Sequence, residues 1–141
     1  MTVPPPERAA HLRPSMLALV AAGGAVGTAA REGLALVAAP VVGMLVVILA
    51  INVVGAFVLG FLLEALLRRG ADVGGRRLVR LAVGTGFCGG FTTYSAFAVL
   101  TAGLLRDGAA SAAVLYAVLT VLLGAVATWA GLASGAGRRR A

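Results

Sequence analysis

Charged residues are scarce in this chain, and cysteine and histidine are almost absent. Only 12% of its 141 residues are charged, against about a quarter in ordinary soluble domains. The single cysteine, Cys88, excludes an internal disulfide, and the single histidine, His11, leaves no cluster for a metal centre or a histidine-based nucleophile. These absences argue against an enzyme and against a disulfide-stapled scaffold.

Apolar residues, by contrast, fill most of the chain. They make up 60% of it, which is more than a short soluble domain can bury. A membrane-spanning helix needs about 20 apolar residues, and four segments are long enough. We expect an all-α membrane protein with four transmembrane helices, at about residues 15–37, 42–67, 78–105 and 109–133. The transmembrane domain then comprises residues 15–134, between a disordered N-terminal tail (1–14) and a basic C-terminal tail (135–141).

The first apolar segment also has features of a secretory signal. A basic tail precedes it, and small residues follow its apolar stretch. A cleaved signal would have no reason to carry Arg31, however, and three further spans follow. We therefore interpret this segment as the first membrane helix.

All basic residues are arginines, and their distribution is uneven. With four spans, both termini and the middle loop lie on one side, and ten of the twelve arginines fall there. The positive-inside rule then predicts a multi-pass protein of the bacterial plasma membrane with both termini in the cytoplasm. Because orientation in the lipid explains the net charge of +7, we expect no nucleic-acid partner.

The third apolar segment is unusually rich in glycine. It contains Gly84, Gly86, Gly89 and Gly90. Each glycine costs a helix about 1 kcal/mol relative to alanine, so the pattern predicts a third helix broken near its middle. Broken backbone within a membrane must be buried in protein or line a cavity. The carbonyls freed by such a break are hard oxygen dipoles, so they would suit a small, hard cation. The alternative is that these glycines only allow neighbouring helices to pack closely.

Few polar side chains lie within the predicted spans, and most can donate a hydrogen bond. Asn52 is a functional-site candidate, and the alternative is an ordinary interhelical hydrogen bond. Tyr94 and Phe97 are spaced to share one helix face, as are Tyr116 and Thr120. No carboxylate lies mid-span, where a cation pathway would need one. We therefore expect a pathway that favours a small anion.

Three stretches together resemble the CrcB (Fluc) family of fluoride channels. They are GGAVGTAAR (23–31), INVVGAFVLG (51–60) and GTGFCGGFTTYSAF (84–97), of which the last is the most specific. The resemblance covers nearly all of the chain after the tail. It implies an antiparallel dimer with a pair of pores, through which fluoride leaves the cytoplasm passively. It also implies a structural sodium ion at the dimer centre, held by the backbone carbonyls of Gly89 and Thr92.

The resemblance also assigns roles to individual side chains. It places the fluoride pathway at Asn52, Tyr94, Ser95, Phe97, Tyr116 and Thr120. It gives structural roles to Gly27, Arg31 and Gly90. Tyr94 departs from the commonest family pattern, which has phenylalanine at this position, so its hydroxyl is expected to affect the selectivity or the rate of transport.

The arginine bias bears on the partner and leaves alternatives open. Family members that insert in both orientations need little charge bias, so ten arginines against two favour one fixed orientation and pairing with an oppositely oriented paralogue. A homodimer is the alternative. Two rival functions are a small multidrug-type antiporter subunit and a non-transporting membrane assembly subunit. The antiporter needs an acidic residue within the first span, and the only candidate, Glu32, lies near the end of that span. The assembly subunit would not require Asn52 or a broken helix.

Overall fold

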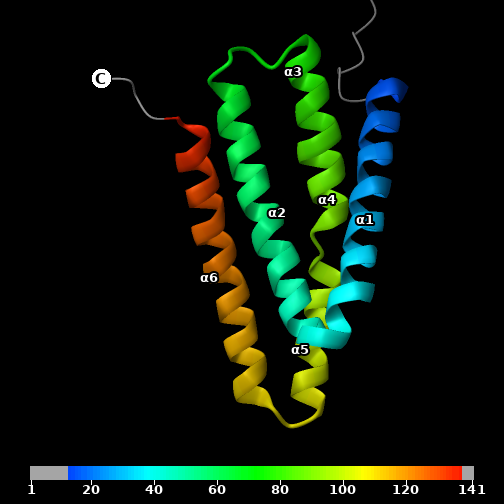
Figure 1. Ribbon diagram of the computed structural model, residues 1–141, viewed down its shortest axis with the longest axis vertical. Helices are drawn as coiled ribbons and strands as arrows, with labels where there is room; N and C mark the ends of the chain where they lie inside the picture. The colour runs from blue at the N-terminus through cyan, green and yellow to red at the C-terminus, as the bar shows by residue number, and fades with distance from the viewer. Residues whose placement is uncertain (1–12, 138–141) are drawn as a thin grey trace, which may run out of the picture.

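The computed structural model describes residues 13–137, and every regular element in that range is a helix (Figure 1). In chain order the elements are α1 (Pro14–Val42), α2 (Met44–Leu67), α3 (Gly74–Val79), the π-helix η2 (Arg80–Cys88), α4 (Gly89–Phe91), α5 (Tyr94–Arg106) and α6 (Ala110–Gly135). Four stretches are long and apolar enough to cross a membrane: α1, α2, the continuous run Gly74–Arg106, and α6. The chain is thus an all-helical, multi-pass membrane protein. Most of the expected tails, at residues 1–12 and 138–141, lies outside the described residues.

The first helix is longer than the sequence suggested. We expected it to end near residue 37, ahead of Pro40, but α1 continues to Val42. Pro40 removes one N–H from the helical ladder and crowds the Leu36 carbonyl, but only Val41 and Val42 follow it in the helix, so the disruption stays local. The helix ends instead at Gly43, whose φ of +85° suits glycine, and the Gly43 N–H donates to the Ala39 carbonyl at 2.9 Å.

The passes form a bundle in which α2 packs mainly on α6, and α1 packs mainly on η2 and α4. Figure 1 shows the α2–α3 loop at the same end of the bundle as the start of α1 and the end of α6. The α1–α2 and α5–α6 turns lie at the opposite end. The arginine-rich loop and the two ends of the described chain therefore share one side of the protein.

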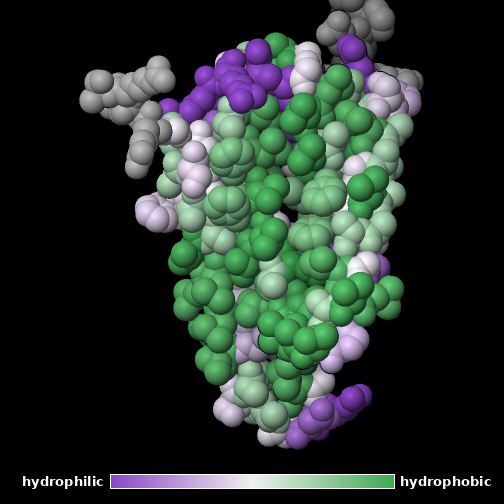
Figure 2. All heavy atoms as spheres, in the orientation of Figure 1, coloured by the Kyte–Doolittle hydropathy of each residue, from purple (hydrophilic) through white to green (hydrophobic). Residues whose placement is uncertain are grey.

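The buried core is small, and apolar side chains cover the outside. The core cluster consists of Ala35, Val47, Ile48 and Ile51. Large apolar side chains are exposed on every long helix, and Figure 2 shows them as a continuous green surface between purple ends. Water would penalise so large an apolar exterior, whereas the hydrocarbon of a bilayer matches it.

Glycines bring the backbone of α1 into contact with the third pass. A Cβ atom on Gly27 would overlap the carbonyl oxygen of Phe87, and a Cβ on Gly90 would overlap that of Gly24. Only residues without a side chain allow this separation between the helices. Close helix packing, one of the two roles that the sequence suggested for these glycines, is therefore present at Gly27 and Gly90.

Arg31 supports the same contact from α1. Its Nε donates to the Gly90 carbonyl at 3.3 Å, and Thr28 Oγ1 donates to the same oxygen at 3.3 Å. Arg31 Nη1 also forms an ion pair with Glu32 at 2.8 Å. The guanidinium therefore spans from an exposed carboxylate to a carbonyl near the middle of the third pass.

The α2–α3 loop is organised by an ion pair between Asp72 and Arg80. Arg80 Nε and Nη2 both donate to Asp72 Oδ2, at 3.0 and 2.8 Å. Arg77 Nε donates to the Asp72 backbone carbonyl at 3.0 Å, and Arg76 Nε donates to that of Ala71 at 2.8 Å. These contacts fold the loop back over the start of the third pass.

Replacing Asp72 with asparagine is expected to lower the melting temperature at neutral pH by no more than about 2 °C, because the pair is exposed. The hydrogen bond from Arg80 lowers the pKa of Asp72 below its usual 3.8. The pair therefore stabilises the fold above that value and loses its effect as the pH falls through the lowered pKa. Thermal scans across pH should show the two melting curves converging in acid. An Asp107→Asn control removes a carboxylate at the other end, and a pH-independent gap for Asp72→Asn would contradict the assignment.

Candidate functional site

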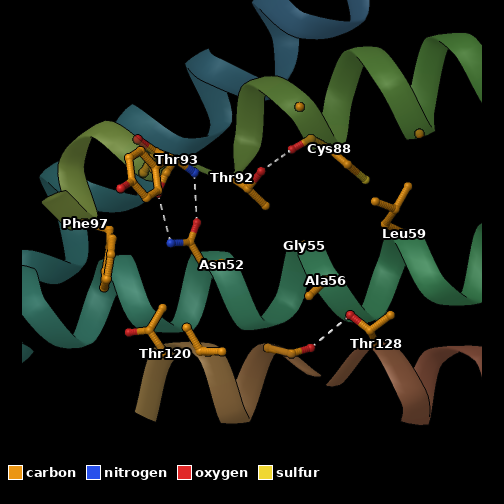
Figure 3. Close-up of a pocket in the computed structure, with 15 residues that line it drawn as sticks. Asn52, Gly55, Ala56, Leu59, Cys88, Thr92, Thr93, Phe97, Thr120 and Thr128 are labelled. Carbon is orange, nitrogen blue, oxygen red and sulfur yellow. Dashed lines mark hydrogen bonds between the residues drawn. The ribbon is translucent and has the colours of Figure 1, made fainter. Parts of the chain in front are cut away.

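A groove of about 520 Å³ lies between α2, α6 and the middle of the third pass (Figure 3). Six residues expected in the functional site line it: Asn52, Gly89, Thr92, Tyr94, Phe97 and Thr120. Its other lining residues among those described are also uncharged at neutral pH, so no carboxylate or guanidinium lines the groove. Such a lining neither repels an anion nor holds it by a full opposite charge.

Two threonines separate α4 from α5 within the groove. Thr92 and Thr93 both have extended backbone, with φ and ψ of −76° and 157° for Thr92 and of −146° and 127° for Thr93. Thr93 caps α5, because its side chain accepts a hydrogen bond from the Ala96 N–H at 3.2 Å. A Ser/Thr cap of this kind stabilises the start of a helix inside the membrane span, where water cannot satisfy the free N–H groups.

Asn52 holds this extended segment from α2. Its Nδ2 donates to the Thr93 carbonyl at 3.0 Å, and its Oδ1 accepts from the Thr93 N–H at 2.8 Å (Figure 3). The amide therefore replaces both backbone bonds that a continuous helix would have supplied to Thr93. An amide nitrogen carries two hydrogens, so Asn52 keeps one further donor at the groove.

The backbone carbonyls of three groove-lining residues, Cys88, Gly89 and Thr92, differ in their hydrogen bonding. Thr92 N and Thr92 Oγ1 both donate to the Cys88 carbonyl, at 3.0 and 2.8 Å. Within residues 13–137, no donor is paired with the carbonyl oxygens of Gly89 and Thr92. A Cβ on Gly89 would meet nothing within 4 Å, so this position adjoins open space. The segment therefore presents two hard oxygen atoms without a hydrogen-bond partner in the described structure.

Three aromatic rings form a row beside Asn52. The ring centroids of Tyr94 and Phe97 are 5.8 Å apart, and those of Phe97 and Tyr116 are 5.5 Å apart. Tyr94 is 80% exposed at the open end, whereas Tyr116 is buried and does not itself line the groove. The Tyr116 hydroxyl has no hydrogen-bond partner in the described part of the chain. Each ring has an electropositive edge and an electronegative face, so a tilted pair brings the edge of one ring toward the face of the next.

Threonines on α6 form the opposite wall. Thr120 Oγ1 donates to the Tyr116 carbonyl at 2.7 Å, and Thr128 Oγ1 donates to that of Gly124 at 2.9 Å. Both hydroxyl hydrogens are therefore used within α6, and each hydroxyl must rotate before it can donate into the groove. Thr120 was expected to donate directly to the pathway, but in this geometry its hydroxyl must first rotate away from the Tyr116 carbonyl.

The remaining expected residues lie outside the groove lining. Ser95 Oγ lies 3.1 Å from Thr93 Oγ1, so it acts on the helix cap. Gly27, Arg31 and Gly90, which were expected to have structural roles, lie at the contact between α1 and the third pass.

Two polar residues of the groove, Thr93 and Thr128, were not assigned to the functional site from the sequence. Two consecutive threonines after a glycine-rich stretch are the pattern of a helix cap, and this pattern was the signal for Thr93. Thr128 continues the spacing of Thr120 and Gly124 by one further turn of α6.

Comparisons with known proteins agree on one family. A family model described as "CrcB-like protein, Camphor Resistance (CrcB)" matches residues 18–132. The chain is 53% identical over 126 residues to "Fluoride-specific ion channel FluC 2" of Leifsonia xyli subsp. xyli, which covers 89% of this chain and 87% of that protein. It is 43% identical over 120 residues to "Fluoride-specific ion channel FluC" of Deinococcus radiodurans, covering 83% and 92% of the two chains. The match to "Fluoride-specific ion channel FluC 1" of Cutibacterium acnes is 42% over 123 residues, or 86% of each chain.

Proposed function

The chain belongs to the CrcB family, and from this premise we propose that it is a fluoride channel that exports the anion passively from the cytoplasm. The groove supports the proposal, because the Asn52 amide, the rings of Tyr94 and Phe97 and several threonines line it without any charged side chain. A membrane potential that is negative inside would drive the anion outward by about 2.3 kcal/mol per charge per 100 mV. No chemical step is required, so the protein acts as a channel and not as an enzyme.

The chemical demand on such a pathway is to replace the water that fluoride holds tightly. In our proposal the free N–H of Asn52 and the ring edges of Tyr94 and Phe97 take over part of that hydration shell. Thr120 contributes when its hydroxyl turns away from the Tyr116 carbonyl. Each contact is neutral, so the anion is stabilised at each position and still released to the next.

We further propose that a structural sodium ion binds the carbonyl oxygens of Gly89 and Thr92. The fit rests on the chemistry of these atoms, since both are hard oxygen donors and neither has a hydrogen-bond partner among residues 13–137. When bound, the ion would compensate the carbonyl dipoles where α4 gives way to α5. We treat the two extended threonines as the break in the third helix that this site requires.

The same proposal includes an antiparallel dimer with both termini of each chain on one side. The groove is open along one side of the single chain, and a second subunit would close it against lipid. Ten arginines against two support one fixed orientation in the membrane, with the termini in the cytoplasm and an oppositely oriented paralogue as the partner.

Fluoride release from vesicles tests the function. Liposomes that contain the protein purified together with its partner subunit, and a potassium fluoride gradient, should release fluoride when valinomycin is added, as measured with a fluoride electrode. A parallel chloride gradient should give no release. Proteoliposomes that release no fluoride, or that release chloride equally well, would contradict the proposal.

Replacing Phe97 with isoleucine is expected to lower that fluoride release about two- to tenfold. Isoleucine keeps most of the volume but removes the ring edge, and edge contacts of this kind are worth about 0.5–1.5 kcal/mol each. Thr101→Val is the matched control, because Thr101 Oγ1 donates to the Phe97 carbonyl but does not line the groove. Equal release by Phe97→Ile and the wild type would remove Phe97 from the pathway.

The rival functions fare less well against the geometry. A multidrug-type antiporter needs an acidic residue inside the first span, but the Glu32 side chain is exposed and paired with Arg31. An assembly subunit without transport would give no fluoride release in the same assay.

A further inference from the structure

A second groove, of about 430 Å³, lies at the arginine-rich end of the bundle, between the end of α2 and the start of the third pass. Leu63, Leu66 and Leu67 form its apolar wall, and Arg76 and Arg80 lie at its polar rim. Leu67 is 73% exposed although it ends a membrane-spanning helix. This second groove therefore combines apolar and basic side chains, whereas the groove described above has no charged side chain.

The charges at the rim do not cancel. Asp72 also lines this groove, but its carboxylate already accepts both hydrogen bonds from Arg80. Arg76 uses only Nε, for the Ala71 carbonyl, and its two terminal nitrogens have no partner among the described residues. Arg76 therefore leaves one uncompensated positive charge above the leucine wall.

The surrounding loop adds to this surplus. Between residues 64 and 80 there are five arginines and two carboxylates, and Arg68 already pairs with Glu64 at 2.7 Å. Figure 2 shows the resulting polar patch at this end of the molecule, directly above the apolar surface. Basic clusters beside a spanning helix attract anionic lipid headgroups near the membrane surface.

We propose that this groove binds an anionic phospholipid, with the phosphate on Arg76 and an acyl chain against the leucine wall. A guanidinium offers a phosphate two parallel N–H donors, and the two terminal nitrogens of Arg76 are available for this. A free phosphate ion would leave the three leucines uncovered, whereas a lipid satisfies both parts of the groove. The bound lipid joins the end of α2 to the start of the third pass, whichever ion the protein conducts.

Lipid-dependent thermal stability of the full-length protein tests the proposal. The protein is purified in a neutral detergent and titrated with phosphatidylglycerol, or with phosphatidylcholine of the same acyl chains. Inorganic phosphate and glycerol 3-phosphate form a third arm without acyl chains. Phosphatidylglycerol should raise the melting temperature with a saturable dependence, and the other two arms should have little effect.

Two arginine variants test whether the stabilisation by phosphatidylglycerol depends on Arg76. Arg76→Gln should raise the phosphatidylglycerol concentration needed for half of the stabilisation about tenfold, because it removes a charge-assisted contact. Arg69→Gln is the matched control, since it removes the same charge from the same loop at a position outside the groove lining. If Arg76→Gln does not melt cooperatively, the salt dependence of the wild type replaces it. The phosphatidylglycerol effect should then weaken between 50 and 500 mM salt, as expected for charge recognition.

Four results would overturn the proposal. Equal stabilisation by phosphatidylcholine would mean that the headgroup is not recognised. Equal stabilisation by inorganic phosphate would identify a site for a free anion. Equal weakening by Arg69→Gln and Arg76→Gln would indicate a diffuse surface potential without a site. A phosphatidylglycerol effect that is insensitive to salt would exclude an arginine–phosphate contact.

Discussion

Replacing Asn52 with aspartate is expected to reduce fluoride release from proteoliposomes at least about 100-fold. A carboxylate beside the path repels the anion, and two like charges about 4 Å apart repel by about 4 kcal/mol at an effective dielectric constant of about 20. Aspartate also cannot donate to the Thr93 carbonyl, which Asn52 Nδ2 reaches at 3.0 Å. Both effects act against transport, one on the anion and one on the segment that shapes the groove.

Two controls separate these effects. Asn52→Leu removes both hydrogen bonds to Thr93 without adding charge, so it reports the structural part, at about 1 kcal/mol for each partly buried backbone group left unpaired. Melting curves and size-exclusion profiles show whether each variant still folds. If Asn52→Asp folds and releases fluoride at the wild-type rate, Asn52 is not beside the pathway.

The membrane architecture could be predicted from composition because one physical rule dominates it. Backbone groups in hydrocarbon must be satisfied within the segment, so a long apolar run with few charges has to be helical. The position of the first turn could not be predicted so well. Pro40 favoured an early end to the first helix, but a proline in the last turn costs few bonds, and the positive φ of Gly43 decides where α1 stops.

Only part of the groove lining could be predicted from the sequence. Asn52 stood out because a lone amide in an apolar span needs partners. The identity of its partner, both backbone groups of Thr93, depends on a contact between residues 41 positions apart. Sequence periodicity describes one helix at a time and carries no information about such a pairing.

The sequence also could not decide to which acceptor the Thr120 hydroxyl donates its hydrogen bond. Thr120 was expected to donate to the pathway, but in the structure it donates to the Tyr116 carbonyl one turn earlier. A threonine in a helix has this local alternative available at all times, and the apolar surroundings strengthen it. In this structure the threonine hydroxyls on α6 can therefore only accept hydrogen bonds from the groove. They can donate into it only after they rotate.

Replacing Gly27 with alanine is expected to destabilise the protein by about 3 kcal/mol or more, at the upper end of the range for overpacked sites. The added Cβ would overlap the carbonyl oxygen of Phe87 and press on the Phe91 N–H at 2.9 Å. Backbone atoms cannot change rotamer to make room, so α1 must move away from the third pass. That movement also stretches the bond from Arg31 to the Gly90 carbonyl, next to Asn52's partner segment.

A matched substitution on the same helix makes the measurement decisive. A Cβ on Gly33 would meet nothing within 4 Å, so Gly33→Ala should keep or slightly raise the melting temperature, because alanine favours helix. Gly27→Ala should lower it by about 10 °C or more. Because both variants add one methyl group to α1, any effect on insertion or on helix propensity is common to them. Equal melting temperatures would show that α1 does not touch the third pass at Gly27, and the contact between Arg31 and the Gly90 carbonyl would then have no support.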